Sequence, residues 1–177
     1  YLECLKKVYQ FSDYIALNIS SPNTSNLRDL EAPELFVEMI NQIKRARKTL
    51  EKKYGYKPIF IKLSPDTGRK NRREHSRAIL DLEIDGVICS NTSIKHSLDR
   101  KGGLSGKLLF AKATESLVDY REFLGDSFPI MASGGVMDVD TYNKKIEAGA
   151  NLVQVYTGMI YQGPSLISKL LSVSNKD

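Results

Sequence analysis

Residues 129–136, Pro-Ile-Met-Ala-Ser-Gly-Gly-Val, decide the fold of this chain of 177 residues. An apolar run of strand length ends in two glycines, and a helical pattern begins near Asp138. Bare backbone N–H groups at such a turn can bind an anion. One unit later, residues 152–158, Leu-Val-Gln-Val-Tyr-Thr-Gly, repeat the theme. Either turn alone could serve tight packing, but the pair is typical of the phosphate site of a (β/α)8 barrel.

The same alternation of strand and helix extends toward the N-terminus. Short β-branched runs predict strands at residues 14–19, 59–63, 86–90, 130–133 and 152–156. Helical patterns lie between them at residues 33–54, 72–82, 111–124, 138–148 and 165–171. Pro33 suits a first helical turn, Asp138 an N-cap and Gly149 a C-cap. This alternation predicts parallel βα units.

Two α/β folds are built from such units, the doubly wound sheet and the (β/α)8 TIM barrel. A dinucleotide-binding sheet would carry Gly-x-Gly-x-x-Gly after its first strand, and this chain does not. A full barrel takes about 250 residues. We therefore expect residues 1–177 to be a single partial domain, with about five C-terminal βα units of a TIM barrel.

Composition and charge exclude few functions. Hydrophobic residues make up 41% and charged residues 27%, as in an ordinary globular domain. The net charge of +5 comes largely from helical Lys and Arg without interleaved aromatics, so we expect solvated helix faces and no nucleic-acid partner. His75 and His96 lie in polar surroundings and predict no metal site. Cys4 and Cys89 are expected to be free and buried.

Side-chain alternation places polar groups inside the predicted barrel. Within residues 59–63, Phe60 and Lys62 would point inward, and Ala16 and Asn18 would do so from the first strand. An inward Lys or Asn is costly to bury without a partner. A ligand would supply that partner, and for Lys62 a neighbouring carboxylate is the alternative.

The loop after the first strand, residues 18–24, reads Asn-Ile-Ser-Ser-Pro-Asn-Thr. Two carboxamides and three hydroxyls around a proline exceed what a plain turn needs. We predict that this loop holds a flat polar substrate and carries the catalytic base. Residues 90–93, Ser-Asn-Thr-Ser, suit the edge of a planar amide ring, although such residues are also common in turns. The glycine-rich residues 101–107 predict either close backbone approach to a ligand or a flexible turn.

Taken together, these motifs resemble dihydroorotate dehydrogenase of the second, quinone-linked class. The resemblance covers essentially the whole chain and rests on residues 18–24, 27–28, 61–66, 85–92, 102–107, 133–136, 154–157 and 163–164. It implies strands four to eight of an FMN-containing barrel. It also implies oxidation of dihydroorotate to orotate in the pyrimidine (UMP) pathway, with ubiquinone as electron acceptor.

The resemblance also implies roles for particular residues. Ser21 would be the base that removes the C5 proton, and the first class has a cysteine at this position. The substrate ring would be bound by Asn18, Asn23, Asn91 and Thr92. The FMN would be held by Asn18, Lys62, Ser90, Gly106, Gly135, Tyr156 and Thr157, with Lys62 near the flavin N1/O2 region.

Some expectations concern what lies outside this chain. The resemblance implies a mitochondrial inner-membrane enzyme whose N-terminal element, absent here, forms the quinone tunnel and contacts the membrane. Because the first barrel strands are also missing, we expect the isolated chain to be inactive. Leu108 departs from the proline usual after Gly-Lys, and the loop at residues 93–102 is short. Two alternatives stay open: a non-redox phosphate-binding lyase or synthase that uses Lys62 as a Schiff-base amine, and an inactive barrel fragment.

Overall fold

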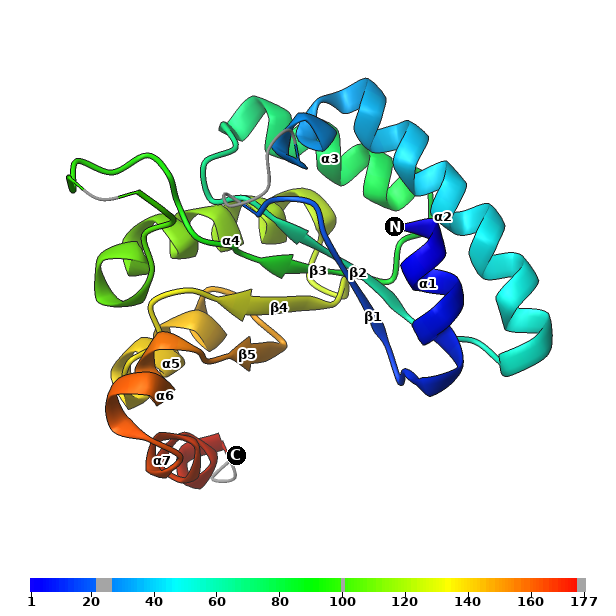
Figure 1. Cartoon of the computed structure of the whole chain (residues 1–177). Helices are drawn as coiled ribbons and strands as arrows, with labels where there is room; N and C mark the ends of the chain where they lie inside the picture. The colour runs from blue at the N-terminus through cyan, green and yellow to red at the C-terminus, as the bar shows by residue number, and fades with distance from the viewer. Residues whose placement is uncertain (22–26, 100, 175–177) are drawn as a thin grey trace.

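Five parallel strands form one sheet in the computed structural model, which describes residues 1–21, 27–99 and 101–174. The strands are β1 (Ile15–Asn18), β2 (Ile59–Leu63), β3 (Gly86–Cys89), β4 (Ile130–Ser133) and β5 (Leu152–Gln154). Their order in the sheet is their order in the chain, β1-β2-β3-β4-β5 (Figure 1). A doubly wound sheet reverses direction at a switch point, whereas a barrel winds one way. The order agrees with the predicted part of a (β/α)8 barrel.

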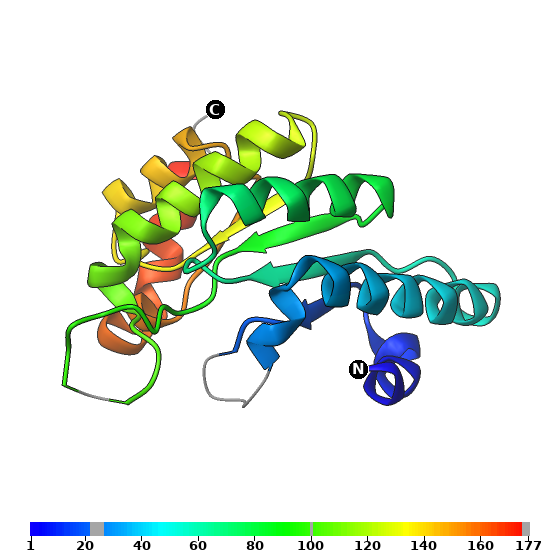
Figure 2. The ribbon, with the colours of Figure 1, turned by 90° about the horizontal axis from the view of Figure 1, so that it is seen from above.

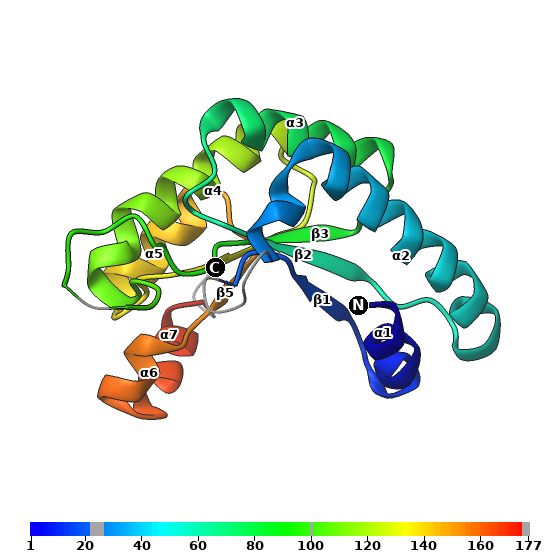
Figure 3. The same cartoon turned by 45° about the horizontal axis from the view of Figure 1, so that its top comes forward.

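Helices cover one face of this sheet. They are α1 (Leu2–Val8), α2 (Pro33–Tyr54), α3 (Arg69–Asp81), α4 (Phe110–Leu124), α5 (Val139–Glu147), α6 (Thr157–Gln162) and α7 (Ser165–Ser174). Short 3-10 helices are η1 (Tyr9–Phe11), η2 (Leu27–Glu31) and η3 (Gly106–Leu109). Figures 2 and 3 show α2, α3 and α4 as one outer layer, with α1 beside β1 and α6 and α7 near β5. None of the helices in the described ranges is both long and apolar enough to cross a membrane.

Alternate residues of β2 serve the two faces of the sheet. Ile59, Ile61 and Leu63 are fully buried in the main core, which the sheet shares with helices such as α2. Phe60 belongs instead to a small cluster with Ile88 and Met131 on the opposite face. In the register of the sheet, Lys62 lies beside Asn18 on one side and Ile88 on the other. The predicted alternation is therefore present, and the inner face carries both an apolar floor and polar groups.

The element boundaries differ from the predictions mainly where polar loops begin. α2 matches its predicted range, and Pro33 occupies its first turn. α3 begins at Arg69, three residues before the predicted start. β5 ends at Gln154 instead of residue 156, because the chain turns into α6. Asp138 is the N-cap of α5 as predicted, whereas the C-cap is Ala148 and Gly149 follows it with φ 97°.

Three predictions about single side chains were wrong. Cys4 is exposed, while Cys89 is buried, and both are free. His75 is 1% exposed and stacks on Phe36 with ring centroids 4.6 Å apart, so it lies in the packed interior and not on a polar surface. The basic helix residues are not all solvated, because Arg47 and Arg72 are buried. The reason is tertiary: Arg47 pairs with Asp85, which precedes β3, and Arg72 pairs with Asp119 of α4.

Candidate active site

A cavity of about 260 Å³ opens at the carboxyl ends of the strands. It is lined by Lys62, Ser90, Asn91, Thr92, Ser105, Gly106, Leu109, Ser133, Gly134, Gly135, Val136, Gln154, Tyr156 and Thr157. Eight of these residues are ones that the resemblance assigns to substrate or cofactor. Because parallel strands end at one edge, residues distant in the chain converge there. The cavity therefore has the position expected of a barrel active site.

Two asparagines from different strands meet at this edge. Asn91 Nδ2 donates to Asn18 Oδ1 at 2.9 Å and to Ser20 Oγ at 3.2 Å. Asn91 Oδ1 accepts from the backbone N–H of Thr92 at 2.8 Å. The Ser20 hydroxyl donates to the carbonyl oxygen of Lys62 at 2.8 Å. These contacts fix the Asn18 and Asn91 amides as a pair that could hydrogen-bond a planar ring.

The Lys62 ammonium lies on the inner face and lines the cavity. Its pKa is lowered by burial, which removes water from the charged group. In the residues with described placement, no hydrogen bond or ion pair is formed by this ammonium, so a neighbouring carboxylate does not explain its position. A charged amine in this condition suits an electron-rich or anionic ligand.

Two glycine turns bring bare backbone to the cavity wall. Gly135 has φ 83°, and a Cβ there would lie 2.4 Å from Phe110 Cα. Gly106 has φ 66°, and its Cβ would lie 3.0 Å from Thr157 Cγ2. Thr157 Oγ1 in turn donates to Ser105 Oγ at 3.1 Å, which joins the glycine-rich loop to the turn after β5. Both turns need glycine for this close packing, and both lie at the cavity wall, where the sequence predicts an anion site.

The start of α5 does not add to this anion site. Asp138 accepts the N–H of Thr141 at 2.8 Å, and the Thr141 hydroxyl closes the capping box. These hydrogen bonds lower the pKa of Asp138. A carboxylate thus already occupies the helix N-terminus. The anion site predicted after β4 is confined to the turn at residues 134–136.

The predicted base lies at the edge of the described region. Ser21 is half-buried and directly follows the fully buried Ser20. Asn23 and Thr24, predicted partners in the same loop, lie outside the described residues. Ser21 thus follows Asn18, one member of the asparagine pair, by three positions in the chain. Its role as a base remains a prediction.

Several cavity residues were not singled out from the sequence. Gln154 aligns with Ser133 in the β4–β5 register and donates to Met131 Sδ at 3.6 Å. Alternation along β5 could have identified it as inward-facing. Ser105 had no such signal, because its position depends on how the glycine-rich loop folds back onto Thr157.

A second, larger cavity of about 540 Å³ lies between α1 and α2. Its walls are mostly apolar, with Tyr1, Leu2, Leu35 and Met39 among them. It contains none of the predicted catalytic or binding residues. Size alone would favour this cavity, but the convergent polar groups lie in the smaller one.

Comparison with known proteins agrees with this geometry. The profile of the family described as dihydroorotate dehydrogenase matches residues 1–173. The dihydroorotate dehydrogenase (quinone) of Aliivibrio salmonicida is 42% identical over 180 residues, covering 97% of this chain and 54% of its own. That of Bartonella tribocorum is 42% identical, covering 92% of this chain and 48% of its own.

Solved structures give the same result. The Eimeria tenella DHODH in complex with ferulenol superposes with a TM-score of 0.90 at 30% identity, over 97% of this chain and 51% of its own. The ligand-free DHODH from Eimeria tenella superposes with a TM-score of 0.89 at 30% identity, over 97% of this chain and 53% of its own. The chain spans about half the length of the relatives it matches. With the family profile covering nearly all of it, the chain belongs to the dihydroorotate dehydrogenase family.

Proposed function

We propose that this chain forms one side of the active site of a quinone-linked dihydroorotate dehydrogenase, which oxidises dihydroorotate to orotate in pyrimidine biosynthesis. The observation that carries the proposal is the convergence, at one edge of the sheet, of the Asn18–Asn91 amide pair and the Lys62 ammonium, which has no partner among the described residues. The amides suit the planar carbonyl and N–H groups of a pyrimidine ring. The names of the relatives support the same reaction.

The residues of the cavity fit FMN. Lys62 would face the pyrimidine side of the flavin, where an ammonium can offset negative charge. Ser90 and Gly106 would contact the cofactor from β3 and the glycine-rich loop, and Gly135 and Thr157 would bind its phosphate. Tyr156, 74% exposed, borders the same turn. When bound, FMN would supply the two-electron acceptor for the reaction.

Substrate would be held and deprotonated by residues of this chain. Asn18, Asn23, Asn91 and Thr92 would orient the ring, and Ser21 Oγ would accept the C5 proton. A hydroxyl is a weak base near neutral pH. Ser21 therefore has to pass the proton on to water or another hydroxyl, and Thr24 and the loops around it are candidates.

The electron acceptor and the location follow from the family. The quinone named for the relatives supports ubiquinone, or a related quinone, as acceptor. The resemblance also implies a membrane contact outside this chain, at the mitochondrial inner membrane. The bacterial relatives give no support for a mitochondrion, so the organelle rests on the resemblance alone.

The test is anaerobic reduction of the bound flavin. The protein that carries this chain should be purified with flavin, and dihydroorotate should bleach its visible absorption while orotate forms. Ser21→Ala should slow this bleaching severely and leave the flavin content nearly unchanged. Bleaching at an unchanged rate would exclude Ser21 as the base. Absence of both flavin and orotate formation in the unchanged protein would refute the proposed function.

A further inference from the structure

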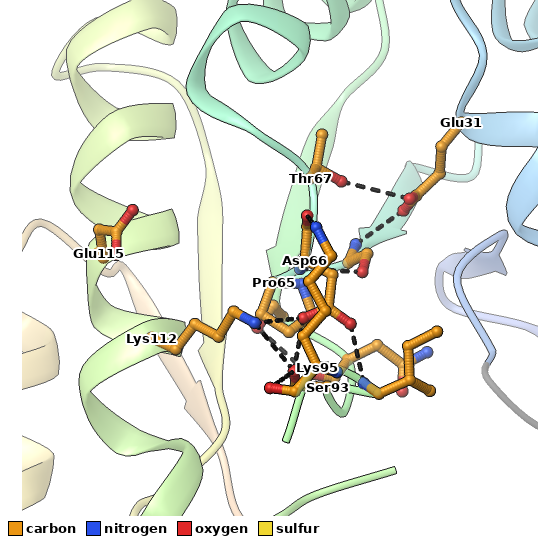
Figure 4. Close-up of polar contacts among 12 residues, drawn as sticks. Glu31, Pro65, Asp66, Thr67, Ser93, Lys95, Lys112 and Glu115 are labelled. Carbon is orange, nitrogen blue, oxygen red and sulfur yellow. Dashed lines mark hydrogen bonds and ion pairs between the residues drawn. The ribbon is translucent and has the colours of Figure 1, made fainter. Parts of the chain in front are cut away.

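The polar loop after β2, residues 64–67, is braced from two sides. The Glu31 carboxylate accepts from Ser64 N at 2.9 Å and from Thr67 Oγ1 at 3.2 Å. Arg72 Nη2 donates to the Pro65 carbonyl at 3.1 Å. Figure 4 shows the Glu31 contacts with the loop that presents Asp66. Hydrogen bonds to the residues on both sides of Asp66 therefore hold its backbone in one position.

The Asp66 carboxylate is 5% exposed and accepts hydrogen bonds from two directions. Oδ1 accepts from Ser93 Oγ at 2.5 Å and from Lys112 Nζ at 2.5 Å, while Oδ2 accepts from Ile94 N at 2.8 Å. Lys112 reaches from α4 and also donates to Ser93 Oγ at 3.0 Å (Figure 4). A buried carboxylate of this kind is stable because the ammonium compensates its charge.

Ser93 connects Asp66 and Lys112 to two segments that line the cavity, the one with Asn91 and Thr92 and the glycine-rich loop. It is the residue after Thr92, and its side chain is fully buried. Its backbone N–H and C=O pair with those of Leu104, at 3.2 and 2.7 Å. Leu104 immediately precedes Ser105, which lines the cavity. Ser93 thus joins the end of the segment with Asn91 and Thr92 to the middle of the glycine-rich loop.

The opposite end of the Asn91 segment is held by the sheet. Ser90 N donates to Ser133 O at 3.0 Å, and Asn91 N donates to Leu63 O at 2.8 Å. With the first end fixed by the backbone ladder, the conformation of residues 91–92 depends on how the second end is fixed. The second end is Ser93, held by Asp66 and Lys112, none of which lines the cavity of about 260 Å³.

We propose that Asp66, Ser93 and Lys112 form a positioning cluster that sets the orientation of Asn91 and Thr92 toward the substrate. The inference rests on the proposed function, because it assigns Asn91 and Thr92 to the ring of dihydroorotate. The cluster acts only through these two residues and touches no reacting atom.

The experiment uses the flavin-loaded protein that carries this chain, with Lys112→Met and Ser93→Ala. Lys112 is 31% exposed, so its replacement by a side chain of similar length is the milder change. Each variant should raise both KM for dihydroorotate and the Kd of orotate by about tenfold, because small displacements of binding groups weaken recognition strongly. Lys112→Arg and Ser93→Thr, which keep the donor, should restore both values toward those of the unchanged protein.

A matched control separates positioning from general stability. Arg47 Nη1 pairs with Asp85 Oδ2 at 2.5 Å. Asp85 lies just before β3, at the end of this strand opposite to Asn91. Arg47→Met also breaks a buried ion pair and should lower the unfolding temperature without changing KM or orotate affinity. Combining Lys112→Met with Ser93→Ala should raise KM by less than the product of the single effects, since the two residues act as one unit.

The results distinguish three cases. The proposal holds if the Lys112 and Ser93 variants raise KM and the Kd of orotate while Arg47→Met does not. It fails if those variants only lower the unfolding temperature, as the control does. If the unchanged protein oxidises no dihydroorotate, the proposed function itself fails, and this inference fails with it.

Discussion

Asn91 and Asn18, separated by 73 positions in the chain, are joined by a hydrogen bond of 2.9 Å from Asn91 Nδ2 to Asn18 Oδ1. The pair spans β2, since Asn18 ends β1 and Asn91 follows β3. The same Nδ2 also donates to Ser20, whose own hydroxyl proton is used on the Lys62 carbonyl. Each amide is thereby fixed in one orientation, and a ligand meets a defined pattern of donors and acceptors.

This pair predicts a strong effect of Asn91→Asp. The substitution replaces a donor by an acceptor that faces two oxygen acceptors, so the pair would separate or bind a proton. We expect orotate affinity to fall about tenfold or more, the loss of a hydrogen bond to a charged or planar ligand being about 1.5–3 kcal/mol. Calorimetric titration measures it. Asn71→Asp, the same change at an exposed position of α3, should leave the affinity unaltered.

Gly135→Ala should abolish flavin retention. Its Cβ would lie 2.4 Å from Phe110 Cα, so either the turn or the start of α4 must move. Gly125→Ala is the matched control, because Gly125 has φ 84° against 83° for Gly135 but nothing within 4 Å of its Cβ. Both changes place a Cβ on a residue with positive φ, which costs about 1–3 kcal/mol. Equal flavin content in the two purified variants would show that the collision is unimportant.

Lys62→Met should raise the unfolding temperature of the flavin-free protein and weaken its binding of flavin. Burial lowers the pKa of the Lys62 ammonium, so the folded protein carries this charge at a cost. Without flavin, the methionine variant should unfold at a higher temperature than the unchanged protein. With flavin, it should bind about tenfold more weakly or worse, through loss of a charge-assisted contact. Lys53→Met, on the exposed side of α2, should change neither quantity. A lower unfolding temperature of the flavin-free Lys62→Met variant would contradict this account.

His75 should make stability depend on pH. Its Nε2 lies 2.7 Å from the Glu31 carbonyl oxygen, which can only accept, so Nε2 donates this hydrogen bond. Its Nδ1 lies 3.3 Å from the Tyr120 hydroxyl, which can donate to the neutral ring. Burial lowers the pKa of His75 below its ordinary 6.5. The unfolded chain therefore binds more protons as pH falls. The stabilising contribution should be complete above about pH 6.5 and be lost as pH drops toward the folded-state pKa.

The measurement is the free energy of unfolding in urea between pH 8 and pH 5, which spans the ordinary titration range of histidine, about 6.5. His75→Gln keeps a donor for the Glu31 carbonyl but cannot titrate, so its profile should be flatter. His96→Gln provides the same substitution at the other histidine. Parallel profiles for His75→Gln and the unchanged protein would argue against a role for His75.

The elements of this fold could be predicted from the sequence because they depend on local patterns. The bounds of β2, β4 and α2 agree with the prediction, since each is set by residues inside the element: an apolar run in each strand, and Pro33 at the start of α2. The ends of β1, β3 and β5 were placed too far out. At these ends the backbone stops pairing with the neighbouring strand and turns toward the cavity. No local sequence pattern predicts where that happens.

Side-chain partners from distant elements could not be predicted. Arg47 was expected on a solvated helix face, yet it meets Asp85, 38 positions later. Asp66 and Lys112, 46 positions apart, gave no local signal either. Which faces of two helices meet depends on the packing of the whole sheet, and charge patterning along one helix does not encode it. The cavity residues were more accessible, because strand ends in a parallel sheet gather at one edge.

Along β2, successive side chains lie on opposite faces of the sheet and are constrained by different neighbours. Ile59, Ile61 and Leu63 are constrained by their helical neighbours, whereas Phe60 and Lys62 face the side where a ligand would lie. Selection for a new ligand can therefore act on every second position of the strand and leave the packing beneath it intact. A barrel of this kind can change its chemistry over evolutionary time more readily than its architecture.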